Sequence, residues 1–133
     1  MNCKKLCRDL KYGFKCEDKL LSKIREKYGE DIEKTKQYAV FDYKNDDIQI
    51  ELKNRRCYSY TYPSMMIGLN KLTNAENSNR RSVFLWNLKD GLFYWNYNKD
   101  EYKTAFGGRK DRGLDERKIV AFIDMKYLKP FEN

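Results

Sequence analysis

Hydrophobic residues near the start of the chain recur every three to four positions, which predicts a helix. Within residues 16–28 charged residues separate the apolar ones, and Gly29 ends the segment. The apolar positions with this spacing are Leu20, Leu21, Ile24 and Tyr28. A second apolar run follows Pro63, and proline is favoured in the first turn of a helix. We therefore expect a second helix from Ser64 to about Ala75, with a buried face made of Met65, Met66, Leu69 and Leu72.

Two short segments in the middle of the chain have the composition of a β-hairpin. Residues 38–43 (YAVFDY) and 48–53 (IQIELK) are rich in strand-forming residues, and the polar residues 44–47 join them. Side chains alternate between the two faces of a strand. Phe41 and Tyr43 are therefore expected on the same face as the isoleucines of the second strand.

A second hairpin is predicted from residues 82–88 (SVFLWNL) and 92–97 (LFYWNY). The Asp90-Gly91 pair between them is a strong signal for a tight turn. A final strand is expected from Ile119 to Met125. This mixture of helices and strands predicts the α/β class, with helices packed on a mixed, mostly antiparallel central sheet, in a single domain of residues 1–133.

The first hairpin brings three charged side chains to one face. Glu51 and Lys53 share a face because they are two residues apart on the second strand. We expect Tyr43 to pair with Ile48, a register that buries the apolar residues together and puts Asp42 on the face of Glu51 and Lys53. Asp42 and Glu51 would then be diagonal neighbours, with backbones about 7 Å apart.

Two carboxylates and an ammonium group at one point can support phosphodiester hydrolysis. Mg²⁺ commonly takes one or two carboxylates together with phosphate oxygens and water. Held by Asp42 and Glu51, with Mn²⁺ as an alternative metal, it would polarise a phosphodiester and lower the pKa of an attacking water. Lys53 would stabilise the negative charge that develops in the reaction. The competing interpretation is a solvent-exposed strand face on which Glu51 and Lys53 form an ordinary ion pair.

The segment FDYKNDDIQIELKNRR (residues 41–56) resembles the PD-(D/E)xK nuclease superfamily, and IELKNRR within it is similar to a segment of archaeal Holliday junction resolvases. The resemblance matches Asp42 to the first acidic residue of the motif, and Glu51 and Lys53 to its E-x-K. It implies a restriction-endonuclease-like fold, whose core runs helix, three-stranded meander, helix and further strand over residues 16 to about 88. Residues 89–133 would add the rest of the second hairpin, a Gly- and Arg-rich loop and the final strand.

The resemblance also implies further site residues. It places Glu17 on the first helix as a third metal ligand, although an acidic residue there could instead complement the helix dipole. It places Lys71 on the second helix near the phosphate. The first meander strand would fall near residues 31–36, although DIEKTK is poor strand sequence and no proline precedes Asp42. Asp47 points to the same face and is an alternative to Asp42, but it lies at the tip of the turn.

Charge and composition narrow the chemistry. The chain carries 28 Lys and Arg against 20 Asp and Glu, a net charge of +8, and has no His. The absence of His excludes Ser-His-Asp and Cys-His nucleophile systems and His-ligated zinc. The positive charge favours a polyanionic partner, with DNA the first candidate, although lysines also keep small proteins in solution. The residues expected to bind the DNA backbone are Arg55, Arg56, Lys71, Arg109 and Arg112.

Two other segments could contact nucleic acid. Residues 107–117 are rich in Gly and Arg and could bring N–H and guanidinium groups to a phosphate, or could form a surface turn whose arginines pair with nearby acids. Tyr58, Tyr60 and Tyr62 are two residues apart, as on one face of a strand. They could stack on bases or pack within a sheet.

The apolar runs and cysteines indicate where the protein works. The apolar runs, such as residues 65–69, are far shorter than the roughly 20 residues of a membrane span, and the N-terminus shows no apolar signal segment. We therefore expect an intracellular protein, cytoplasmic or nuclear, with no membrane partner and with reduced cysteines. A zinc site of Cys3, Cys7, Cys16 and Cys57 would have no standard ligand spacing.

Two functions from different classes remain open. The first is a Mg²⁺-dependent nuclease that acts on DNA with structure selectivity or weak sequence specificity, and that could work as a homodimer. The second is a non-catalytic nucleic-acid-binding or viral packaging protein on the same fold, which would keep the basic surface without needing Glu51. Lys, Asn and Tyr have AT-rich codons and are frequent, as in a protein of a virus or mobile element.

Overall fold

The computed structural model describes residues 19–36, 39–107 and 118–132. Residues 19–28 are helical, as the apolar spacing predicts. The elements that follow along the chain are β1 (Glu33–Lys34), β2 (Tyr43–Lys44), β3 (Ile48–Asn54), β4 (Ser64–Gly68), α2 (Leu69–Asn77), β5 (Arg81–Leu88), β6 (Gly91–Asn96), β7 (Tyr102–Gly107), β8 (Lys118–Asp124), the 3₁₀ turn η1 (Met125–Tyr127) and β9 (Lys129–Pro130).

The strands form two sheets. The larger has the order β1-β2-β3-β5-β6-β9, and the smaller has the order β4-β8-β7. β3 and β5 run parallel, whereas the other paired strands are antiparallel. Parallel neighbours need a long crossover connection. β4 and α2 provide it, because they lie between β3 and β5 in the chain.

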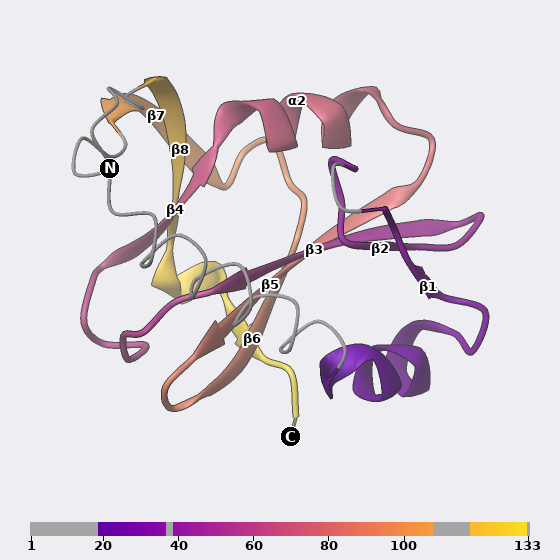
Figure 1. Cartoon of the computed structure of the whole chain (residues 1–133). Coiled ribbons are helices and arrows are strands. Elements are labelled where there is room, and N and C mark those ends of the chain that lie inside the picture. Colours follow the sequence, from indigo (N-terminus) through magenta and orange to yellow (C-terminus); the bar gives the residue numbers. More distant parts are fainter. Residues whose placement is uncertain (1–18, 37–38, 108–117, 133) are drawn as a thin grey trace, which may run out of the picture.

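The large sheet is the middle of three layers (Figure 1). The helix of residues 19–28 packs on one face through Leu20 and Ile24, which contact a core that includes Ile50 and Val83. The other face is covered by α2 and the small sheet. β3 and β5 are therefore buried on both faces. β5 is accordingly apolar from Val83 to Trp86, whereas β3 carries the polar Gln49 and Glu51 among its buried residues.

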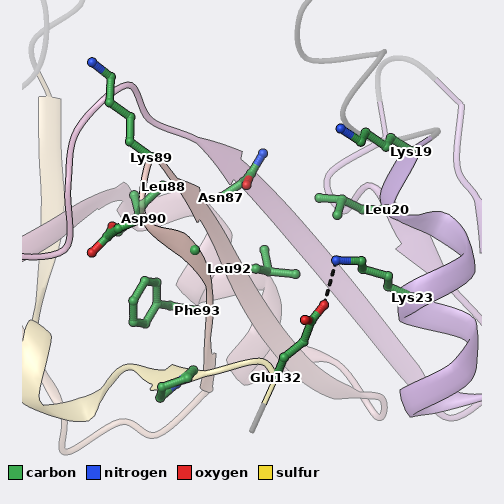
Figure 2. A pocket seen from close by; sticks show the side chains of 12 residues that line it. Lys19, Leu20, Lys23, Asn87, Leu88, Lys89, Asp90, Leu92, Phe93 and Glu132 are labelled. Atoms are coloured by element: carbon green, nitrogen blue, oxygen red, sulfur yellow. Dashed lines mark hydrogen bonds and ion pairs between the residues drawn. The ribbon is translucent and has the colours of Figure 1, made fainter.

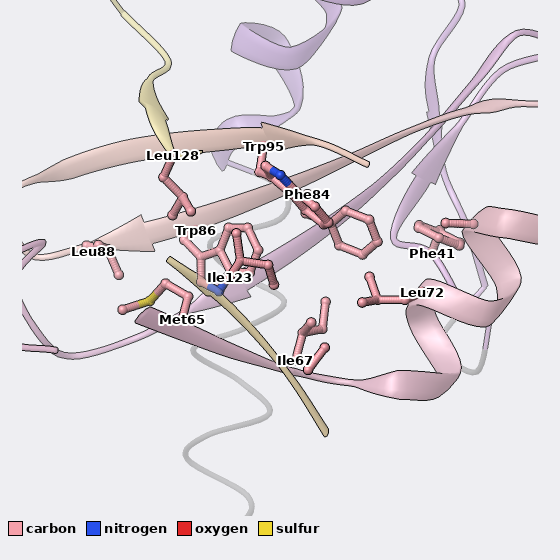
Figure 3. Close-up of a cluster of buried hydrophobic side chains, with 12 residues drawn as sticks. Phe41, Met65, Ile67, Leu72, Phe84, Trp86, Leu88, Trp95, Ile123 and Leu128 are labelled. Atoms are coloured by element: carbon pink, nitrogen blue, oxygen red, sulfur yellow. The ribbon is translucent and has the colours of Figure 1, made fainter. Parts of the chain in front are cut away.

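Aromatic side chains fill the core between the two sheets (Figure 3). Phe84 lies 5.5 Å from Trp95 and 6.3 Å from Trp86, measured between ring centroids. Phe84 and Trp86 are two residues apart on β5 and face this core, while Val83 faces the opposite one. The β5–β6 hairpin with its turn before Gly91, and the final strand β8, confirm the expected strands.

The predicted second helix begins later than expected. Residues 64–68 form the strand β4 and pair with β8, and the helix starts only at Leu69. Met65 and Ile67 are buried while Met66 is half-buried, so the run follows the two-residue period of a strand. The helical part keeps the expected Leu72 in the core.

The predicted strand over residues 38–43 is also wrong for most of its length. Residues 40–42 form a bend, and only Tyr43 and Lys44 pair as β2. The bend lets Phe41 and Tyr43 enter different cores, since Phe41 packs 5.7 Å from Phe84 whereas Tyr43 lies with Ile50 on the helix side. A continuous strand would have sent both to one face.

Three further features depart from the expectations or complete them. The poor strand sequence at residues 31–36 does form the short strand β1. β7 has no counterpart among the predicted elements. The tyrosines at 58, 60 and 62 lie in a loop and not on a strand.

In the residues that the structure describes, no helix is both long and apolar enough to cross a membrane.

Stability should depend most on the residues at the parallel β3–β5 pair. Ile50 is fully buried there, so Ile50→Ala is expected to lower the free energy of unfolding by about 2–5 kcal/mol and Ile50→Val by about 0.5–1.5 kcal/mol. Urea titration followed by tryptophan fluorescence measures both. The exposed control Lys129→Ala should change it by less than about 0.5 kcal/mol. Equal effects of the three substitutions would contradict this placement of β3.

Candidate functional site

The hairpin register sets two acidic residues opposite each other. Tyr43 pairs with Ile50, two residues further along than the expected partner Ile48. A shift of two keeps the side chains of β2 and β3 on their expected faces, because the strand period is two, whereas the bend before β2 sends Phe41 to the other face. Continuing the observed register by one residue brings Asp42 opposite Glu51, closer than the expected diagonal arrangement.

Asp42 is fixed by the backbone of β3. Its own N–H donates to the carbonyl of Ile50 at 2.9 Å, and its Oδ2 accepts from the N–H of Leu52 at 2.8 Å. Asp42 precedes β2, which begins only at Tyr43, so the N–H of Leu52 is bonded by the Asp42 side chain and not by a backbone carbonyl of a paired strand. Asp42 is half-buried, so its second oxygen can take part in further contacts without losing the anchor.

Glu51 is a buried carboxylate held between two lysines. It lies in the interior strand β3 with 3% of its surface exposed. Lys53 Nζ is 3.2 Å from Oε1, and Lys71 Nζ is 3.3 Å from Oε2. Lys71 also donates to the carbonyl oxygen of Val40. Because a buried charge is costly unless it is paired, the two ammonium groups are what allows a carboxylate at this position.

The surroundings of Glu51 favour its neutral form. Burial raises the pKa of Glu51 above its ordinary value, and the negative charge of Asp42 raises it further. Lys53 and Lys71 act in the opposite direction on the same pKa without cancelling the rise. Burial thus outweighs the two lysines in its effect on the pKa of Glu51.

The donor set fits a hard divalent cation. Asp42 and Glu51 offer carboxylate oxygens on facing segments, and the charge of a cation between them would counteract burial and the charge of Asp42, which together raise the pKa of Glu51. The described residues contain no group of three or more His, Cys, Asp and Glu side chains that could hold a metal. The expected third ligand, Glu17, lies outside the described residues. Two carboxylates with phosphate oxygens and water are an ordinary ligand set for Mg²⁺.

A hollow of about 330 Å³ is lined by neighbours of the charged cluster, although Asp42, Glu51, Lys53 and Lys71 are not among its lining residues. Its walls include Val40 and Gln49. Lys71 donates both to the carbonyl of Val40 and to the carboxylate of Glu51, and Gln49 lies two residues before Glu51 on the same face of β3. Gln49 is buried and donates to Ser82 Oγ at 2.8 Å. The sequence analysis did not include Gln49 among the site residues, although its position two residues before Glu51 on the same strand predicts that both side chains lie on one face.

A larger groove of about 750 Å³ lies elsewhere, between the helix of residues 19–28, the β5–β6 turn and the end of the chain (Figure 2). Lys23 and Glu132 form an ion pair of 2.6 Å across it. Its described lining includes neither Glu51 nor Lys53. The larger hollow is thus separate from the charged cluster on β3.

The remaining predicted residues are scattered or lie outside the described chain. Arg55 and Arg56 directly follow β3 and are exposed. Arg109 and Arg112, with most of the Gly- and Arg-rich segment, fall outside the described residues, as do Cys3, Cys7 and Cys16. Cys57 is a half-buried free thiol. Asp47 is exposed at the turn, away from the lysines that hold Glu51, so Asp42 is the residue that the fold brings to the site.

Comparison with known families identifies the family of the chain. A sequence model of the family described as "phage putative PDDEXK endonuclease" matches residues 14–132. No curated protein matches the chain. The order of helix, β1-β2-β3, α2 and a β5 that runs parallel to β3 is that expected of a restriction-endonuclease-like core. The expected fold class and superfamily are confirmed.

The raised pKa of Glu51 makes a prediction about stability. Between its ordinary value of 4.5 and the higher value in the folded protein, the folded state binds more protons than the unfolded state. The free energy of unfolding should therefore fall as pH rises through this window. Glu51→Gln cannot titrate, so its stability relative to wild type should rise by about 1.4 kcal/mol for each pH unit crossed inside the window.

Urea titrations from pH 4 to pH 8 measure this difference. The exposed control Glu30→Gln should follow the wild-type profile closely. Parallel profiles for wild type and Glu51→Gln would show that Glu51 is not held in the environment described here.

Proposed function

We propose that this chain, which belongs to the phage PD-(D/E)xK endonuclease family, hydrolyses DNA phosphodiester bonds with a divalent metal ion held by Asp42 and Glu51. The observation that carries the proposal is the buried Glu51, which faces Asp42 and contacts Lys53 and Lys71. A solvent-exposed ion pair, the competing interpretation of the E-x-K, would not be buried to this extent. Charged side chains are rarely buried in full, and buried carboxylates with a perturbed pKa cluster at functional sites.

Asp42 and Glu51 would hold Mg²⁺, or Mn²⁺ in its place. The bound ion would supply Lewis acidity toward a phosphate oxygen and lower the pKa of a water molecule. Asp42 keeps its anchor to the N–H of Leu52 while it binds, so the position of its carboxylate is fixed in advance. Glu51 is fixed in the same way by its place in the interior of the sheet.

The two lysines have roles that follow from their partners. Lys53 Nζ contacts one oxygen of Glu51 and would stabilise the negative charge that develops on the reacting phosphate. Lys71 reaches the other oxygen from α2, and its second bond to the carbonyl of Val40 fixes its position. If a cation were bound by the Glu51 carboxylate, both ammonium groups would be available to phosphate oxygens, which are negatively charged like the carboxylate.

The rest of the chain supports a DNA substrate. The net charge of +8 attracts a polyanion, and Arg55 and Arg56 leave β3 next to the site, where they would bind the backbone. Arg109 and Arg112 are proposed for the same task. So small a domain offers few groups for reading bases, which favours structure-selective or weakly specific cleavage. Cutting both strands would take two active sites, as in a homodimer.

Nicking of supercoiled plasmid tests the catalytic proposal. Wild type with Mg²⁺ should nick, and chelation by EDTA should abolish nicking. Glu51→Gln and Lys53→Ala should each reduce the rate by about 10²-fold or more, because each removes a group that acts on the reacting phosphate. Lys129→Ala is the matched control for Lys53→Ala, because it also removes one positive charge, but on an exposed edge strand. This variant should cut at nearly the wild-type rate.

The non-catalytic alternative gives a different result. If wild type, Glu51→Gln and Lys53→Ala all bind DNA equally and none cuts with Mg²⁺ or Mn²⁺, the chain is a nucleic-acid-binding protein on this fold. Binding should weaken as salt rises in either case, since phosphate contacts release counterions.

Metal binding can be measured without any reaction. Calorimetric titration with Mn²⁺ should show one site in wild type and a loss of at least tenfold in affinity for Asp42→Asn and for Glu51→Gln, since each removes one charged ligand. Asn at position 42 retains an oxygen for the N–H of Leu52, so the fold should persist, as checked by circular dichroism. Unchanged Mn²⁺ affinity in both variants would contradict the assigned ligands.

A further inference from the structure

We propose that Tyr58 and Tyr60 form a stacking platform for an unpaired nucleobase, so that the enzyme selects DNA with a single-stranded segment near the cleavage site. The inference rests on the proposed function, because it names the form of DNA that the site would take. The two rings are 5.2 Å apart between centroids and 11° from parallel. Tyr58 is 41% exposed and Tyr60 is 78% exposed. One face of the pair is therefore open to solvent.

The loop that carries the platform is tied to the β5–β6 turn. Ser59, between the two tyrosines, donates from its N–H and its Oγ to the carboxylate of Asp90, at 3.0 and 2.6 Å. The carbonyl of Cys57 accepts from the N–H of Lys89 at 2.9 Å. Within the loop, the N–H of Tyr58 donates to Thr61 Oγ1 at 2.9 Å. The rings are thus held in place before any ligand arrives, which reduces the entropy lost on binding.

An ammonium group lies beside the platform, and the carboxylate of Asp90 is held by the residue between the two tyrosines. Lys89 Nζ lies 5.6 Å from the centroid of the Tyr58 ring, and Figure 2 shows its side chain extending away from the body of the protein. Arg55 and Arg56 begin the same loop. Flat aromatic rings beside an ammonium group match a nucleotide, which has a π-face and a phosphate. A purely apolar partner would leave these charges unused.

The platform is close to the proposed catalytic cluster along the chain. From Glu51 to the end of β3 at Asn54 is three residues, or about 10 Å at the rise of a strand. Tyr58 follows four residues later. Phosphates on one DNA strand are about 3.4 Å apart along the helix axis, so about three nucleotides would span the length from Glu51 to the end of β3, where the loop with the platform begins. A base inside a duplex cannot offer its face, so the stacked base must be unpaired.

Binding measured in the Glu51→Gln background tests the platform without cleavage. Fluorescence anisotropy compares a single-stranded oligonucleotide, the same oligonucleotide with abasic sites, and a duplex, at fixed salt and without metal. Tyr60→Ala should weaken single-strand binding by about 5- to 100-fold, as expected for the loss of one stacked base, while duplex binding changes less than twofold. Abasic sites should reduce the affinity of the parent protein and leave that of Tyr60→Ala nearly unchanged.

Two matched variants separate stacking from other effects. Tyr60→Phe keeps the ring and should bind like the parent. Tyr62→Ala removes a tyrosine that is 57% exposed in the same loop but outside the stacked pair, and should also bind like the parent. Equal losses for single strand and duplex, or no loss for either, would overturn the platform; the latter would direct attention to a protein partner. A protein that nicks plasmid while Tyr60→Ala has no effect refutes this inference alone, whereas stacking without nicking refutes only the catalytic proposal.

Discussion

The site and the fold both depend on one buried charge, the carboxylate of Glu51. It sits in the interior of a sheet, where an unpaired ion would be unfavourable by several kcal/mol. Lys53 from the same strand and Lys71 from α2 provide the pairing. The position of α2 over the sheet is therefore part of the electrostatic solution as well as part of the packing.

The parallel pairing of β3 and β5 creates this arrangement. Parallel strands cannot be joined by a hairpin, so the chain must leave the sheet and return. The excursion contains β4 and α2, which bury Met65, Ile67 and Leu72 against the aromatic core (Figures 1 and 3). The same helix brings Lys71 to Glu51 on β3. A hairpin at this point would have given a stable sheet with no second lysine.

Asp42 shows how a structural irregularity serves the site. The bend at residues 40–42 ends the ladder of β2, and the Asp42 carboxylate takes over a backbone hydrogen bond from Leu52. The same bend exposes the carbonyl of Val40 to Lys71. The local disruption of this strand thus orients both the carboxylate of Asp42 and the ammonium group of Lys71 around Glu51. The cost is repulsion between two carboxylates, which a bound cation would relieve.

The sequence by itself determined the charged face, the parts of the core with a clear period and the turn at Asp90-Gly91. Alternation along IQIELK fixes which residues share a face. This assignment of faces is correct although the predicted register was wrong by two residues, because the strand period is two. Tertiary structure decided the rest. Residues 64–68 became a strand because β8, distant in sequence, pairs with them, and Tyr58 and Tyr60 left the strand pattern because Asp90 holds Ser59. Local patterns record which face is apolar, whereas these outcomes depend on partners more than 30 residues away, which no local period encodes.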